Sequence, residues 1–188
     1  MTSANTFDAA KTMHLVAYLA RNTGASLYSV LKMMYLADKK HLERFGRFIV
    51  NDHYAALPKG PVPSRTYDAL KAVREGRFEG DAVAAKGLLR LCGTSHQFTI
   101  EGDPDLMHFS KSDIRCLDEV IEVYKKRGHW HVYRASHDKA WHAARPNATM
   151  SPAAIASTLK NSTELIQHLA DPYPDKAERE VEPDAVPA

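Results

Sequence analysis

Histidine is the residue type in this sequence that most directly suggests catalytic or metal-binding chemistry. The chain has 10 histidines, and four of them fall within a short stretch: His129, His131, His137 and His142. Imidazole is a common zinc ligand, and two ligands on one helix are typically four residues apart. The successive spacings here are two, six and five, and no Cys-x-x-Cys pair accompanies them. A metal-dependent hydrolase built on the His129–His142 cluster is therefore an alternative hypothesis, and we expect no metal and no cofactor.

Asp38 and Asp52 are the carboxylates that could support acid–base chemistry, because His41 and His53 lie close to them in the sequence. Asp38 follows Tyr35 by about one helical turn, at the edge of an apolar face, where an ionised carboxylate needs a hydrogen-bonding partner. We expect Asp38 to accept hydrogen bonds from Tyr54 or from backbone amides of the segment after the helix. Asp52 is expected to cap a turn. Both interpretations make these residues structural.

The sequence contains no motif of nucleophilic catalysis or phosphate binding, since G-x-S-x-G, G-x-x-x-x-G-K-[ST] and G-x-G-x-x-G are all absent. Cys92 and Cys116 have no basic neighbourhood that would favour a reactive thiolate. We therefore expect no catalytic residue and no enzymatic activity. Two cysteines in unrelated settings indicate reduced, packed thiols. With neither a secretory signal nor an apolar run of about 20 residues, we expect a cytoplasmic protein without a membrane contact.

Apolar residues recur at helical spacing through much of the chain, which predicts the helices that must position these side chains. Ser26 is placed to cap the second helix, and Gly46 is placed to close it in a left-handed conformation. Ser110 and Asp113 form a start that resembles a capping box, and Gly128 is expected to close that helix. The predicted helical segments are residues 8–21, 26–46, 64–76, 110–128, 130–144 and 151–169.

Two short segments, 88–92 and 97–100, flank a Gly-Thr-Ser-His turn and predict a small β-hairpin. Residues 48–63 lose helical periodicity and contain Pro58, Pro61 and Pro63, so we expect an ordered connector, with Ser64 capping the next helix. The predicted fold class is mainly α: a compact single-domain bundle of about six helices with a small β-hairpin. We assign this domain to residues 1–170.

The charge of the chain is unevenly distributed. Residues 171–188 hold six acidic and two basic residues, a net −4, so the overall +2 leaves +6 on residues 1–170. This tail is rich in Pro, Asp and Glu, and we expect it to be disordered. The positive domain leaves a DNA-binding regulator of its own operon as another alternative. Its densest basic groups, Lys39-Lys40 and Lys125-Lys126-Arg127, lie near predicted helix ends, where cations complement the helix dipole.

A series of short motifs runs from the second helix to the third. They read L-K-M-M-Y-L-A-D at 31–38, F-G-R at 45–47, N-D-H-Y-A-A at 51–56, K-G-P-V-P at 59–63 and Y-D-A-L at 67–70, followed by S-H at 136–137 and A-W at 140–141. In this order and spacing they resemble the SocA-type antitoxin domain, also called the Panacea domain, over roughly residues 10–170. Phe45 and Phe48 depart mildly from the Tyr and Pro that are frequent in the family. The matching positions are Asp38, Gly46, Asp52, Tyr54, Gly60, Pro61, Pro63, Tyr67, His137 and Trp141.

The resemblance implies that the protein works by binding another protein. Members of this family neutralise a cognate protein toxin by direct contact, and at least the founding type also acts as an adaptor that presents its toxin to the ClpXP protease. Toxins differ widely between systems, so the resemblance implies a partner encoded by a neighbouring gene without naming it. We expect the K-G-P-V-P segment to brace the second and third helices, with Asp38, Asp52 and Tyr54 as supports.

Three aromatic residues are candidates for contact with the partner. Trp130 and Tyr133 lie close together in the sequence, and large aromatic groups dominate the energetics of protein interfaces. Tyr28 is expected to be exposed on the second helix. The alternative is that Trp130, Tyr133 and Trp141 fill the core beneath the last helices. Trp141 also follows His137 by four residues, which is close enough for the two rings to stack.

Overall fold

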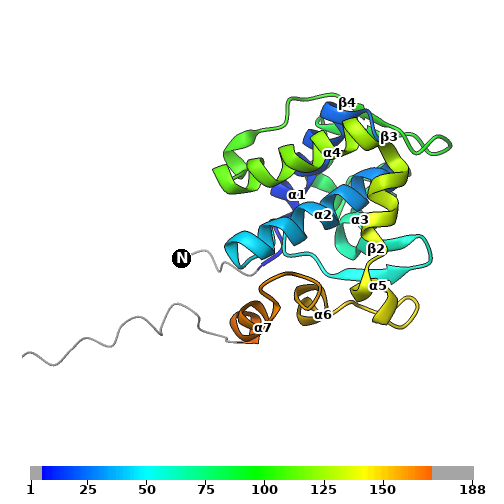
Figure 1. Ribbon diagram of the computed structural model, residues 1–188. Helices are drawn as coiled ribbons and strands as arrows, with labels where there is room; N and C mark the ends of the chain where they lie inside the picture. The colour runs from blue at the N-terminus through cyan, green and yellow to red at the C-terminus, as the bar shows by residue number, and fades with distance from the viewer. Residues whose placement is uncertain (1–5, 171–188) are drawn as a thin grey trace, which may run out of the picture.

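One helix, α2 (Leu27–Phe45), runs through the middle of the protein, and the other elements surround it (Figure 1). The computed structural model describes residues 6–170. Twelve of the 19 residues of α2 are buried, because its apolar side chains occupy more than one face and each of these faces must be covered. The helix ends as predicted at Gly46, whose φ of 69° is left-handed and whose amide donates to the carbonyl of Leu42. Ser26 precedes it without making the predicted side-chain cap.

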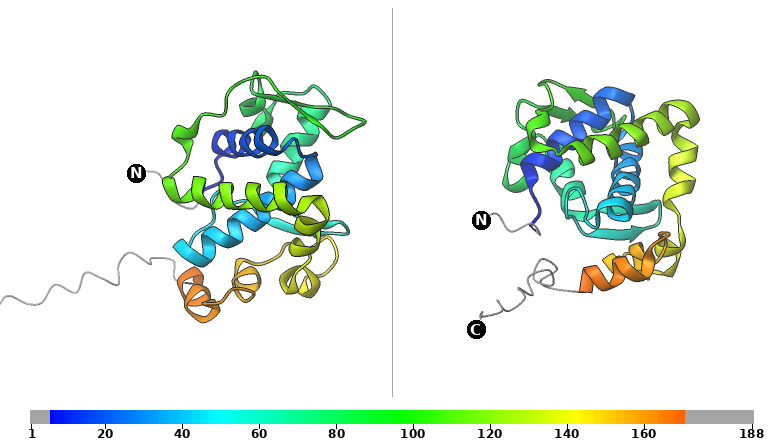
Figure 2. Two further views of the ribbon diagram at one scale, coloured as in Figure 1. Left: turned by 45° about the horizontal axis from the view of Figure 1, so that its top comes forward. Right: turned by 60° about the vertical axis from the view of Figure 1, so that its left-hand side comes forward.

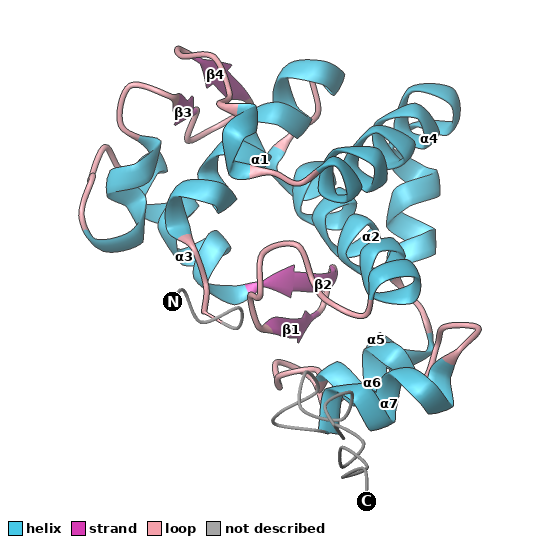
Figure 3. Ribbon diagram, turned by 90° about the vertical axis from the view of Figure 1, so that its left-hand side faces the viewer, coloured by secondary structure: helices cyan, strands magenta, loops and turns pink. Residues whose placement is uncertain are grey.

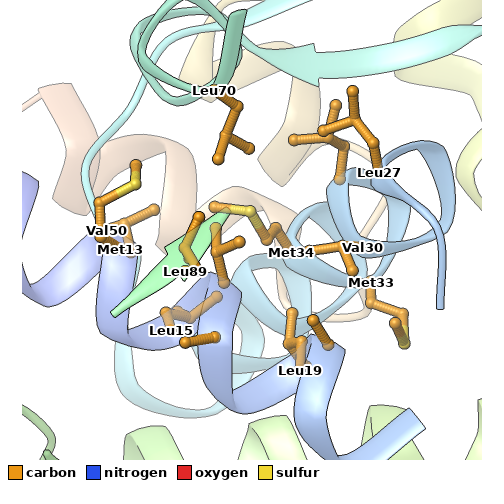
Figure 4. Packing of buried hydrophobic residues seen from close by; sticks show 14 of the residues in the cluster. Met13, Leu15, Leu19, Leu27, Val30, Met33, Met34, Val50, Leu70 and Leu89 are labelled. Atoms are coloured by element: carbon orange, nitrogen blue, oxygen red, sulfur yellow. The ribbon is translucent and has the colours of Figure 1, made fainter. Parts of the chain in front are cut away.

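The main core lies where α2 meets α1 (Ala9–Thr23), α3 (Ser64–Arg74) and α4 (Lys111–Ser136). Figure 4 shows side chains of α1 and α2 facing one another, with Leu70 of α3 pointing toward them and Leu89 lying among them. A second cluster lies between α2 and the C-terminal helices α5 (Lys139–Ala143), α6 (Pro152–Ala156) and α7 (Ser162–Ala170). Its largest members are Tyr35, Leu42, Phe48, Tyr54, Met150, Ile155 and Leu165.

The segment between α2 and α3 contains a β-hairpin, which corrects the prediction that residues 48–63 form an ordered connector without a regular element. Strand β1 (Tyr54–Leu57) pairs antiparallel with β2 (Gly60–Pro63), and Ala56 lies opposite Pro61. Ala56 exchanges its own backbone hydrogen bonds with residues 147 and 148, so its pairing with Pro61 needs no amide donor from the proline. Prolines at alternate positions are therefore compatible with this strand. Figure 3 shows the hairpin between α2 and the layer formed by α5, α6 and α7.

Helix α4 also differs from its prediction. Ser110 and Asp113 form the predicted capping box at its start. Gly128 breaks the helical geometry with φ 73° and ψ −176°, a conformation essentially restricted to glycine, but the helix resumes at once and continues to Ser136. The two parts run in different directions, so the second part descends toward the β1–β2 hairpin (Figure 2). Gly128 is thus a bend in the helix and does not end it.

The remaining elements agree with the mainly α fold class. The predicted hairpin forms from β3 (Leu89–Leu91) and β4 (Phe98–Ile100), while the short 3-10 helices η1 (Gly80–Ala85) and η2 (Leu106–His108) were not predicted. The predicted last helix is two helices, α6 and α7, because residues 157–161 form turns between them. Seven α-helices therefore form within residues 6–170, where about six are predicted.

Both cysteines are free, but only Cys116 is buried, so the expectation of two packed thiols is wrong for the exposed Cys92. None of the helices formed by residues 6–170 is long and apolar enough to cross a membrane. The predicted disordered tail, residues 171–188, lies outside the described residues.

The start of α3 is capped from a distance, which corrects the prediction that Ser64 caps it. Pro63 is the N-cap residue and Ser64 is the first helical residue. The buried carboxylate of Asp52 accepts hydrogen bonds from the amides of Arg65 (3.1 Å) and Thr66 (2.8 Å) and from the Thr66 hydroxyl (2.6 Å). Asp52 thereby satisfies amides that have no partner within the helix and places a negative charge at its positive end. Because Asp52 precedes β1 and α3 follows β2, these hydrogen bonds hold the start of the hairpin next to its end.

Replacing Asp52 by Ala removes this cap and leaves the buried amide and hydroxyl of Thr66 without their acceptor. We expect Asp52→Ala to lower the free energy of unfolding by about 2 kcal/mol. Urea denaturation followed by circular dichroism measures the change. The matched control is Asp68→Ala, which removes an exposed aspartate from the same helix and should leave stability nearly unchanged. Equal stability of the two variants would contradict the capping role.

Candidate functional site

The hairpin is attached to α2 by the buried side chain of Asp38, which is only 1% exposed. One carboxylate oxygen accepts the amide of Ile49 and the other accepts the hydroxyl of Tyr54, both at 2.7 Å. Burial raises the pKa of Asp38 to about 6, while these donors and nearby His41 act in the opposite direction. Asp38 is thus the hydrogen-bond acceptor that the sequence predicts, although it lies inside the core and not at its edge.

A second set of polar contacts connects α2 to α5. The Tyr35 ring packs edge-to-face on Tyr54, with 5.0 Å between ring centroids, and its hydroxyl donates to Asp138 at 2.9 Å. Asp138 also pairs with Lys39 and accepts the amides of Ala140 (3.0 Å) and Trp141 (3.1 Å) at the start of α5. The Asp38–Tyr54 and Tyr35–Asp138 pairs therefore form one continuous contact from the hairpin to α5.

The turn of the hairpin fits closely against α2, α4 and α5. Trp141 donates its indole N–H to the carbonyl of Leu57 (3.0 Å), and Lys32 donates its ammonium to the carbonyl of Pro61 (2.8 Å). Gly60 has a φ of +99°, and a β-carbon there would lie 2.7 Å from Cε1 of His137. This position therefore requires glycine for both its conformation and its close approach.

Four aromatic rings follow one another along the second part of α4 and into α5. Ring centroids are separated by 5.8 Å between Trp130 and Tyr133, 4.1 Å between Tyr133 and His137, and 4.4 Å between His137 and Trp141. The last pair meets edge-to-face, so the predicted stacking of His137 and Trp141 takes that form. The inner rings hold the hairpin, whereas Trp130 at the outer end is 67% exposed. The exposure of Trp130 contradicts the alternative that it fills the core.

The three predicted partner-binding residues lie near one another at the outer end of this row of rings. Tyr28, Lys32, Lys59, His129 and Tyr133 line a pocket of about 170 Å³. Trp130 contacts two of these, with its ring centroid 5.3 Å from His129 and 5.8 Å from Tyr133. Tyr28 is half-buried and not exposed as predicted, because it packs on His96 and lies beneath the ammonium of Lys59. We call Tyr28, His129, Trp130 and Tyr133 the aromatic surface.

Sequence reasoning missed Lys32, Lys59 and His129 as members of this site. The signal for Lys32 was its position four residues after Tyr28 and three before Tyr35, which places all three on one side of α2. Lys59 was recognised only as part of the K-G-P-V-P segment. His129 was considered only as a metal ligand, and its Nδ1 lies 2.7 Å from the hydroxyl of Ser29.

The geometry of the described residues gives little support to the two alternative functions, a metal-dependent hydrolase and a DNA-binding regulator. Within the described residues, no three His, Cys, Asp or Glu side chains lie close enough together to hold a metal ion. Several of the clustered basic residues form ion pairs within the described residues. Lys39 pairs with Asp138, Lys40 with Glu119, and Lys126 with Glu122. The expectation that Lys39 and Lys40 serve mainly the helix dipole is therefore incomplete.

The sequence matches a known protein family. A model of the family described as "Antitoxin SocA-like, Panacea domain" matches residues 30–142. This range includes Asp38, the β1–β2 hairpin and the second part of α4, which are the elements that build the site. No curated protein and no solved structure matches the chain.

The contact between Tyr54 and Asp38 should give stability a recognisable dependence on pH. Tyr54→Phe removes a donor to a buried carboxylate, so we expect a loss of about 2 kcal/mol at pH 8, where Asp38 is ionised. The loss should be smaller at pH 5, because a hydrogen bond from Tyr54 stabilises a protonated carboxyl less than it stabilises a carboxylate. In terms of linkage, Tyr54→Phe raises the folded-state pKa of Asp38 further, so the variant loses more stability than the wild type as pH rises.

Urea denaturation at the two pH values measures this difference. Tyr67→Phe is the control, because the Tyr67 ring packs against the main core and its hydroxyl makes no hydrogen bond within the described residues. A Tyr54→Phe variant as stable as the wild type at both pH values would show that the contact does not hold the hairpin.

Proposed function

The chain belongs to the family of SocA-like antitoxins with a Panacea domain, and from that premise we propose that it neutralises a cognate toxin by direct binding. The toxin is a protein encoded by a neighbouring gene, and the two meet in the cytoplasm. Binding alone accounts for neutralisation, so the proposed role requires no catalytic step by this chain.

The observation that carries this proposal is the exposed Trp130 on a rigid support. An indole that is 67% exposed and held by neighbouring rings presents a large apolar area to a partner at a low cost in side-chain entropy. The supporting rings are fixed by the hairpin, which in turn is held by Asp38. The aromatic surface is therefore organised before a partner arrives, which reduces the entropy lost on binding.

We propose further that the protein can deliver its bound toxin to the ClpXP protease. Support for delivery comes from the family resemblance, since the founding type of the family works in this way. In that case the aromatic surface holds the toxin, and a different part of the chain contacts the protease. Masking of the toxin and delivery for degradation both require the same first complex.

The proposed binding surface is tested by co-expression with the neighbouring gene. Wild-type protein should restore growth, and Trp130→Ala should fail to do so, because loss of a central aromatic contact costs about 2 kcal/mol or more, roughly a thirty-fold loss of affinity. The matched control is Met107→Ala, which removes an apolar side chain that is 89% exposed in η2. Growth measurements and isothermal titration calorimetry give the two readouts.

Two outcomes of this experiment would contradict the proposed function, and a third would contradict only the proposed binding surface. A neighbouring gene that is harmless by itself, or equally toxic with the wild-type chain present, would contradict the antitoxin function. Full rescue by Trp130→Ala would leave the function intact and place the binding surface elsewhere.

Delivery is tested by degradation of the toxin in a purified system. With ClpXP and ATP, the toxin should be degraded quickly only when the wild-type chain is added, and Trp130→Ala should slow this degradation because less complex forms. Met107→Ala again serves as the control. A toxin that is bound and inhibited but not degraded faster would contradict delivery and leave masking as the mechanism.

A further inference from the structure

Lys32 is a buried lysine whose side chain has no ion-pair partner among the described residues. Its side chain belongs to the core of α2, with 2% of the residue exposed, and its ammonium has the Pro61 carbonyl as a hydrogen-bond acceptor. Within residues 6–170, no carboxylate forms an ion pair with it, and burial alone lowers the pKa of Lys32 to about 7. A buried ammonium without a counter-charge is costly, so such a residue is a candidate for a functional site.

The pocket into which Lys32 faces carries an excess of positive charge. Lys32 and Lys59 line it together with His129, and no Asp or Glu of the described residues does so. Asp138, which follows His137 in the sequence, is engaged with Lys39 and Tyr35. The pocket therefore favours an anionic group.

The donors and the size of the pocket define that group more closely. An ammonium has three N–H groups, and the hydrogen bond that Lys32 makes within the described residues goes to the carbonyl of Pro61, so donor capacity remains for a ligand. His137 and Lys32 both approach Gly60, and Nδ1 of His137 is 2.7 Å from the carbonyl of Tyr133, so Nδ1 carries a proton and Nε2 of the neutral ring can only accept. Burial lowers the pKa of His137 and thus favours this neutral form. Lys32 and Lys59 are then the main cationic donors to the pocket.

A volume of about 170 Å³ is below the range of roughly 300–1,000 Å³ that is usual for small-molecule sites. It suits a single side chain that enters from a larger surface. The aromatic surface around the opening provides such a setting, because Tyr28 and Tyr133 form its walls and Trp130 lies beside it.

We propose that this pocket receives an aspartate or glutamate side chain of the partner toxin, whose carboxylate pairs with Lys32 and Lys59. The inference rests on the proposed antitoxin function and adds the chemistry of the contact. Trp130 supplies apolar contact area beside the pocket, and the buried lysine makes the site specific for an acidic residue. Binding would also supply the counter-charge that Lys32 lacks within the described residues.

The first test uses the free protein and does not need the toxin. Sodium acetate is titrated into the full chain against sodium chloride at equal ionic strength, with NMR shifts of Lys32, His129 and Tyr133 as the readout. We expect saturable shifts at these residues with acetate only, and none in Lys32→Met. Shifts that do not saturate, or identical shifts in Lys32→Met, would overturn the assignment of the pocket.

The second test measures affinity for the product of the neighbouring gene. Lys32→Met keeps the length of the side chain and should weaken binding about ten-fold or more, whereas Lys126→Met, on the first part of α4, should stay within about two-fold. Lys59→Met changes only an exposed turn residue and should also weaken binding, so the result does not depend on one core substitution. Circular dichroism verifies the folding of each variant.

The third test identifies the acidic residue on the partner. Each Asp or Glu of the toxin is changed to Asn or Gln, and one of these changes should weaken binding to the wild type but not weaken it further in Lys32→Met. If the wild type binds the toxin and Lys32→Met binds equally well, the pocket inference fails and the antitoxin function stands. If the wild type does not bind the toxin, the proposed function fails, and the acetate titration still decides whether the pocket takes a carboxylate.

Discussion

A carboxylate on a buried face of a helix needs hydrogen-bond donors from within the protein. For Asp38 of α2, these donors come from the chain that follows the helix. Its two oxygens accept the amide of Ile49 and the hydroxyl of Tyr54, so the returning chain must pass close to the middle of the helix. That requirement fixes the position of the β1–β2 hairpin, and Asp52 then fixes the start of α3 against it. The cost of burying a charge is offset by these bonds, and the result is a single defined path for the chain.

The path of the chain through the hairpin also determines which side chains lie at the surface. The hairpin presents the carbonyls of Leu57 and Pro61 to Trp141 and Lys32, and Gly60 allows His137 to approach the backbone. These contacts hold the second part of α4, whose direction is set by the bend at Gly128. The ring of Trp130 thus lies outside the core because of a chain of contacts that begins at Asp38. The K-G-P-V-P segment therefore has two roles, since its residues brace the fold and Lys59 also lines the pocket.

Local patterns in the sequence were enough to predict much of the fold. The spacing of apolar residues located most helices, and the capping box at Ser110 and the left-handed Gly46 formed as expected. Features that depend on distant residues were missed. Pro61 argued against a strand in the sequence. The strand tolerates this proline because Ala56, its partner across the hairpin, makes its hydrogen bonds with residues 147 and 148. The capping of α3 by Asp52 could not be predicted for the same reason, because Asp52 is distant in the sequence from the amides of Arg65 and Thr66 that it caps. For the site, the three aromatic candidates could be chosen by residue type, but the exposure of Trp130 and the burial of Lys32 follow from tertiary packing alone.

In the proposed complex, a toxin binds to the surface that the hairpin and the second part of α4 hold in place. Hydrogen–deuterium exchange of the full chain, with and without the product of the neighbouring gene, tests it most directly. We expect slower exchange on binding at the hairpin turn and in the part of α4 after Gly128, with little change in η1 and η2. Protection confined to η1, η2 or α7, with none at the hairpin turn or after Gly128, would contradict it.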